Sequence, residues 1–141
     1  MSTPLQQEIG RTERVLDALL TERVLEGGPF GSVTEWVAAN ILAIASLTTT
    51  DLQGALAVRA GDLDVTLERM SNAGLVMIDG DRVTLSASGL SALQAGRIKT
   101  SHVASRITQA ITSADREATV RTLSAVRDIA SRFRESGIPA K

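Results

Sequence analysis

The sequence contains no cysteine and no tyrosine, and its only histidine is His102. Without thiols the chain can form no disulfide, no thiolate metal site and no thiol-based redox sensor. A single imidazole also cannot build a histidine metal cluster. No Gly-x-Ser-x-Gly motif or metal-spaced set of acids is present. These gaps argue against an enzyme, and we expect the protein to need no cofactor.

Long apolar runs are missing as well. The longest, residues 36–47, spans 12 residues and includes Asn40 and Ser46, so it is too short to cross a bilayer. Residues 1–5 do not carry the basic region and apolar run that open a secretory signal. We therefore expect a cytoplasmic protein with no membrane association.

Aromatic residues make up only 2% of the 141 residues, whereas 43% are hydrophobic and 22% are charged. This balance is typical of a globular protein, and the length fits one domain over residues 1–141. The core must then be built from leucine, valine, isoleucine and alanine.

Charge is unevenly distributed although the net charge is only −1. Residues 1–47 and 48–89 each carry three arginines against six acids, which gives −3 for each segment. Residues 90–141 carry nine bases against four acids, which gives +5. A DNA-binding segment is normally basic, so the acidic middle segment is unfavourable for DNA binding.

Two helices are predicted in the first third of the chain. Apolar residues recur at helical spacing over residues 4–26, with Thr3 as the expected N-cap and Gly27-Gly28-Pro29 as the stop. The second helix, over residues 32–47, begins with the capping box of Ser32 and Glu35. It is apolar on nearly every side, so we expect it at the centre of the fold.

A helix–turn–helix pattern follows. Thr50 and Gln53 form a second capping box for a helix over residues 51–57, and residues 59–61 supply the turn. The next helix, over residues 62–73, ends at Gly74. Its predicted buried stripe consists of Leu63, Leu67 and Met70, and its opposite face of Asp62, Val65, Glu68, Arg69 and Asn72.

The period then changes from helical to alternating. Residues 75–78 and 82–85 flank Asp79-Gly80-Asp81, a strong signal for a tight hairpin turn. Two further helices are predicted over residues 88–111 and from the cap residue Ser113 to Gly137. The predicted fold is therefore mainly α with a small β-hairpin wing: a winged helix–turn–helix over residues 32–89, flanked by terminal helices over 4–27 and 90–136.

This order of elements resembles the MarR family of bacterial regulators. The stretch that matches best is residues 52–75, followed by the hairpin and by residues 83–89, which look like the family's Leu-Thr-x-x-Gly entry into its fifth helix. Residues 111–115 resemble the polar turn before the family's last helix. The resemblance implies an obligate homodimer whose terminal helices interlock and whose winged helices bind the halves of a pseudo-palindromic operator. It also implies a small ligand that releases DNA.

The resemblance and the helix geometry together select candidate DNA contacts. These are Arg59, Gly61, Asp62, Val65, Arg69, Asn72 and Arg82. The family prefers serine, threonine or arginine near the start of the recognition helix, whereas this chain has Gly61, Asp62 and Val65. Asp62 and Asp64 can equally be helix-capping residues, and Arg82 can equally be a solvated hairpin residue.

Candidate ligand-binding residues are Trp36, His102 and Arg14, on elements that line the family's ligand pocket. Trp36 can also be an ordinary core residue, and His102 a structural one. The leading functional hypothesis is a homodimeric, ligand-responsive transcriptional regulator that binds double-stranded DNA. The alternative is a MarR-like dimer that has lost operator binding and binds a small molecule or a protein partner.

Overall fold

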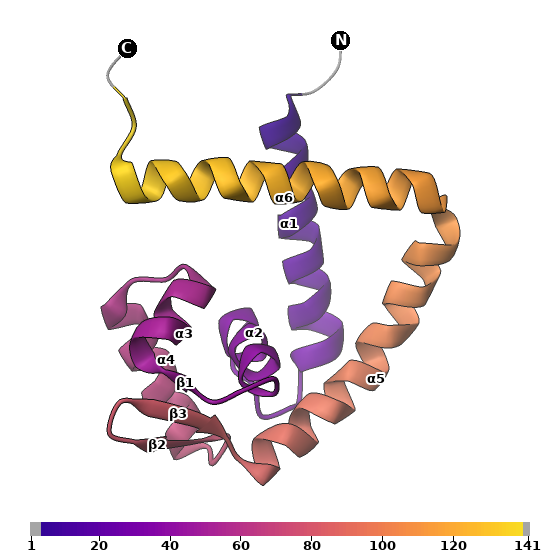
Figure 1. Cartoon of the computed structure of the whole chain (residues 1–141). Coiled ribbons are helices and arrows are strands. Elements are labelled where there is room, and N and C mark those ends of the chain that lie inside the picture. The colour runs from indigo at the N-terminus through magenta and orange to yellow at the C-terminus, as the bar shows by residue number, and fades with distance from the viewer. Residues whose placement is uncertain (1–3, 140–141) are drawn as a thin grey trace. The chain divides into compact units, whose positions relative to one another are not determined.

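The computed structural model describes residues 4–139. Its residues fall into two compact units, one ending at Thr100 and the other beginning at Ser101, which are described separately. Figure 1 traces the elements along the chain. They confirm the predicted fold class, mainly α with a small antiparallel sheet.

The predicted first helix is present as α1 (Leu5–Leu19), which continues into a π-helical segment, η1 (Leu20–Leu25). Gly27, with a φ of 77°, turns the chain out of this helix. The expected cap, Thr3, lies outside the described residues.

The central helix, α2 (Val33–Leu42), begins at the predicted cap: the Ser32 Oγ accepts a hydrogen bond from the Glu35 amide at 3.2 Å. The prediction that it continues to Leu47 is wrong. Leu47 instead pairs with Val83 in a sheet, and the Ser46 and Thr84 hydroxyls lie 2.9 Å apart. A helix to Leu47 is excluded because residues 47–48 form a strand that pairs with the distant hairpin.

The helix–turn–helix consists of α3 (Thr49–Leu56) and α4 (Ala60–Asn72). Thr48, rather than Thr50, caps α3, and its Oγ1 accepts from the Asp51 amide at 3.1 Å. Thr48 has the extended backbone that an N-cap needs, whereas Thr50 is already inside the helix. The turn passes through Ala57, which has a left-handed φ of 56°.

The predicted hairpin forms from β2 (Val76–Asp79) and β3 (Arg82–Leu85). Asp79 pairs with Arg82 across the turn, where Gly80 adopts a φ of 61°. A third strand, β1 (Leu47–Thr48), pairs with β3, so the sheet order is β1-β3-β2. The sequence pattern did not reveal this two-residue strand.

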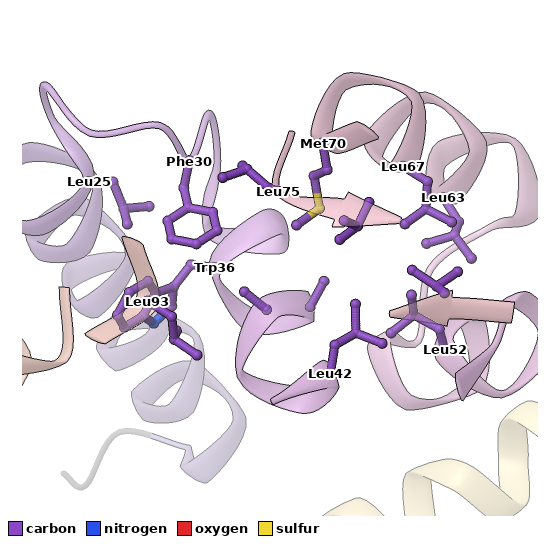
Figure 2. Close-up of a cluster of buried hydrophobic side chains, with 14 of the residues drawn as sticks. Leu25, Phe30, Trp36, Leu42, Leu52, Leu63, Leu67, Met70, Leu75 and Leu93 are labelled. Atoms are coloured by element: carbon purple, nitrogen blue, oxygen red, sulfur yellow. The ribbon is translucent and has the colours of Figure 1, made fainter. Parts of the chain in front are cut away.

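The core of the first unit lies between α2, α3, α4 and the sheet. Leu63, Leu67 and Met70 of α4 are buried, as predicted, and Figure 2 shows them on the side facing Leu42 and Leu52. Trp36 contacts Phe30 edge-to-face, with ring centroids 5.8 Å apart. The apolar α2 is therefore central to this unit.

The chain then enters α5 (Ala87–Ala110), where the Ser86 Oγ accepts from the Gly89 amide and donates to the Gly74 carbonyl. A Cβ at Gly89 would lie 2.1 Å from the Leu75 carbonyl oxygen, so only glycine fits this close approach. Thr112, rather than the predicted Ser113, caps α6 (Ser113–Ser136). No helix among the described residues has the length and apolarity needed to span a membrane.

Candidate functional site

The outward face of α4 is the first candidate surface. Gly61, Asp62, Val65 and Asn72 are all exposed there, as predicted, and Val65 is 68% exposed. No side chain of the described chain caps this helix, and Arg59 occupies its N-cap position. The first amides of a helix lack intrahelical acceptors and carry the positive end of its dipole. The start of α4 can therefore donate hydrogen bonds to an anion such as a phosphate.

Arg69 does not project freely with these residues. Its Nε and Nη2 donate to the two carboxylate oxygens of Glu35 on α2, and its Nη2 also donates to the Pro29 carbonyl at 2.7 Å. The hydrogen bond with Glu35 raises the pKa of Arg69 above its ordinary value, which favours the charged guanidinium at the buried carboxylate. The sequence expectation that Arg69 faces outward omitted this partner, which is 34 residues away.

Two other arginines are better placed to meet a ligand outside the fold. Arg59 is exposed at the start of α4, and Arg82 is exposed at the start of β3. The only hydrogen bond of the Arg82 side chain among the described residues is a long one, 3.4 Å from its Nη1 to the Ser46 carbonyl. Both cations therefore retain free donors.

Acidic side chains also lie on the exposed face of α4. A cleft of about 420 Å³ separates α4 from the hairpin, and its lining includes Asp64, Glu68, Asn72 and Ile78. Asp64 and Glu68 are exposed, so water screens their repulsion of a nearby phosphate without removing it. The acids therefore disfavour many phosphate contacts on this surface. A phosphate is best accommodated at the first amides of α4, which precede these carboxylates along the helix.

A second candidate site surrounds Trp36. An open cleft of about 400 Å³ is lined by Trp36, Val37, Asn40, Ile41, Ile44, Arg97 and Thr100. Arg97 donates to the Asn40 Oδ1 from Nε at 3.1 Å and from Nη2 at 2.9 Å, and the Asn40 Nδ2 donates to the Trp36 carbonyl. The cleft thus combines an apolar wall with one cation.

Sequence reasoning identified Trp36 but missed Asn40 and Arg97. A single asparagine within an apolar helix was a usable signal, whereas Arg97 lies 57 residues from its partner and gave none. Arg14 is exposed on α1 and does not line this cleft. His102 is exposed on α5 and belongs to the second unit, so its role in ligand binding stays a prediction.

The terminal helices expose apolar side chains. None of the described residues of α1 or α6 is buried. Leu5 and Leu16 on α1 are 51% and 42% exposed, and Ile129 and Phe133 on α6 are 51% and 43% exposed. Because of the helical period, each pair lies on one side of its helix. Each helix therefore presents an apolar stripe without a covering layer.

Comparison with known proteins gives matches among solved structures alone. No protein-family model matches the chain, and no curated protein does. The reduced form of MarR from E. coli superimposes with a TM-score of 0.71 and 22% identity, over 89% of this chain and 95% of that one. A MarR family protein from Mycobacterium tuberculosis, solved in complex with DNA, gives 0.68 and 20% over 89% and 98%.

A third structure is that of BpsR from Bordetella bronchiseptica, whose DNA binding is regulated by 6-hydroxynicotinic acid. It gives a TM-score of 0.71 at 18% identity, over 91% of this chain and 96% of that one. At such identities the similarity establishes the shared fold. The winged-helix architecture with added terminal helices thus extends over almost the whole chain.

Proposed function

We propose that this protein is a MarR-type transcriptional regulator that binds double-stranded DNA as a homodimer and performs no catalysis. The observation that carries the proposal is that α4 begins with no side-chain cap and lies beside a β-hairpin, within a fold shared with MarR-family regulators. A helix of this kind fits the major groove, while the hairpin reaches the neighbouring backbone.

In this proposal α4 reads bases through few side chains. Asn72 can form two hydrogen bonds with adenine, and Asp62 can accept one from the amino group of cytosine. Arg59, Arg82 and the first amides of α4 contact phosphates. Since acids outnumber bases on this segment, we expect modest affinity and a strong dependence on salt.

The homodimer explains the apolar stripes of α1 and α6. Soluble monomers rarely expose contiguous apolar patches, and a twofold interface buries the same patch on both copies. Pairing these stripes would set two α4 helices at a fixed separation, as a palindromic operator requires.

The Trp36 cleft is the proposed effector site. Its apolar wall suits a small planar ring, and Arg97 supplies a cation for an acidic substituent. The regulation of BpsR by 6-hydroxynicotinic acid, an aromatic acid, supports this class of effector. We therefore expect an aromatic carboxylate to bind here and to lower DNA affinity.

Selection of bound duplexes from a random library, at about 50 mM salt, tests this function. We expect a pseudo-palindrome whose affinity falls steeply between about 50 and 200 mM salt. Enrichment of no sequence would contradict the proposal. The exposed acids of α4 then favour the second candidate, a dimer of the same fold that binds a protein or small-molecule partner.

A further inference from the structure

Glu35 is the one charged residue buried in the described core, with 3% of its surface exposed. It lies in the first turn of α2, next to Trp36. Its carboxylate accepts hydrogen bonds from the Nε and Nη2 of Arg69 and, at 3.0 Å, from the Gly31 amide. Every polar atom of this buried side chain therefore has a partner.

Arg69 connects α4 with α2 and with the loop that precedes α2. Its side chain comes from α4, binds Glu35 on α2 and reaches the Pro29 carbonyl in the loop before α2. This loop packs directly on the guanidinium: a Cβ at Gly31 would lie 2.8 Å from the Arg69 Nε and 2.9 Å from its Cζ. The guanidinium is therefore held on two sides.

The buried side chains of α4 are all apolar. Leu63, Leu67 and Met70 supply burial, but contacts of this kind are non-directional and tolerate small rotations of a helix. A two-pronged arginine–carboxylate pair is planar and fixes both distance and angle. A buried pair of charges adds little net stability compared with apolar packing, so its clearest contribution here is orientation.

We propose that the Glu35–Arg69 pair is a positioning device that sets the rotation of α4 about its own axis relative to α2. This inference rests on the proposed function: the rotation of α4 decides which side chains face the bases. Arg69 then contributes to operator recognition through Glu35 and makes no base or phosphate contact of its own. The direction in which Asp62, Val65 and Asn72 point therefore depends on this pair.

Glu35→Gln tests the proposal against simple charge counting, with Glu68→Gln as the matched control. Both variants remove one negative charge, and Glu68 is exposed on the same helix that Arg69 occupies. Charge counting predicts tighter DNA binding for both. We expect Glu68→Gln to bind the selected operator at least as well as the wild type, and Glu35→Gln to bind it about tenfold more weakly. Equal or tighter operator binding by folded Glu35→Gln would overturn the proposal.

The salt dependence of Arg69→Gln separates positioning from phosphate contact. A lost phosphate contact lowers the slope of log affinity against log salt by about 0.9 per subunit. We expect operator affinity to fall while this slope, and the affinity for mixed-sequence DNA, stay unchanged. A slope reduced by about that amount would assign Arg69 to the DNA backbone and overturn the proposal.

Gly31→Ala provides a variant that keeps both charges, in case Glu35→Gln does not fold. The three atoms nearest to the added methyl all belong to the guanidinium of Arg69. Operator affinity should therefore fall here too, and an unchanged affinity would overturn the proposal. Hydrogen exchange of the α4 amides tests the same point without DNA, and we expect faster exchange in Gly31→Ala and Glu35→Gln than in Glu68→Gln. Should the wild type bind no DNA, the proposed function fails, while this exchange comparison still decides whether the pair orients α4.

Discussion

The winged-helix part of the chain and the terminal helices α1 and α6 differ in how far their apolar side chains are buried. On α2, α3 and α4 the single tryptophan and four leucines, Leu42, Leu52, Leu63 and Leu67, are buried, and the buried carboxylate of Glu35 has its partners. On α1 and α6 no described residue is buried. The first region completes its own core, whereas the other has apolar surface that a second copy can cover. The two regions should therefore respond differently to substitution and to protein concentration.

The largest effect is expected at Arg69, inside the self-contained region. Arg69→Ala leaves the Glu35 carboxylate buried without its cation, which costs about 3–5 kcal/mol in the free energy of unfolding. Glu35→Gln should cost less, because the Arg69 side chain left behind is 45% exposed and can be hydrated. Urea denaturation measures the free energy of unfolding of both variants. An equal loss of this free energy would contradict the argument that buried Glu35 needs its partner more than exposed Arg69 does.

Substitution on α6 should act on assembly. The double variant Ile129→Glu with Phe133→Glu places charges on the apolar stripe and should weaken self-association roughly a hundredfold. Ser131→Glu, on the opposite side of α6, is the control and should leave association unchanged. Sedimentation equilibrium reports the dissociation constants, and a double variant as dimeric as the control would remove the stripe from the interface.

A smaller effect is expected from the exposed cations of the winged helix. Arg82→Gln should lower the salt slope of DNA binding by about 0.9 for each subunit in contact. Fluorescence anisotropy from about 50 to 200 mM salt gives this slope. Glu68→Gln is again a useful reference, because it changes charge without removing a cation. An unchanged slope would place Arg82 in solvent, as a hairpin residue only.

The smallest effect concerns the backbone of Ala57. An alanine with a φ of 56° is strained by about 1–2 kcal/mol, and glycine removes this strain at a cost of about 0.5–1 kcal/mol in unfolded-state entropy. Ala57→Gly should therefore raise the free energy of unfolding by up to about 1 kcal/mol. Ala55→Gly, inside α3, should lower it by about that much. Thermal unfolding of the pair checks the opposite signs.

Local patterns predicted most of the fold. The stripe of Leu63, Leu67 and Met70 and the Gly80 hairpin depend on neighbours in sequence, and both are confirmed. The errors arise where distant partners decide. Leu47 pairs with Val83 in the sheet, so α2 does not extend to it. The Glu35 partner of Arg69 could not be predicted either, because no local pattern reports a partner on another helix. A DNA contact by Arg69 stays a prediction.

Sedimentation of the protein with its selected duplex tests most directly whether the terminal stripes join two copies on DNA. Labelled duplex and protein are mixed at increasing ratios, and the mass of the complex is measured. We predict saturation at two chains per duplex and a free protein that sediments as a dimer. A free protein that stays monomeric at micromolar concentration, or a saturated complex with one chain, would contradict the account.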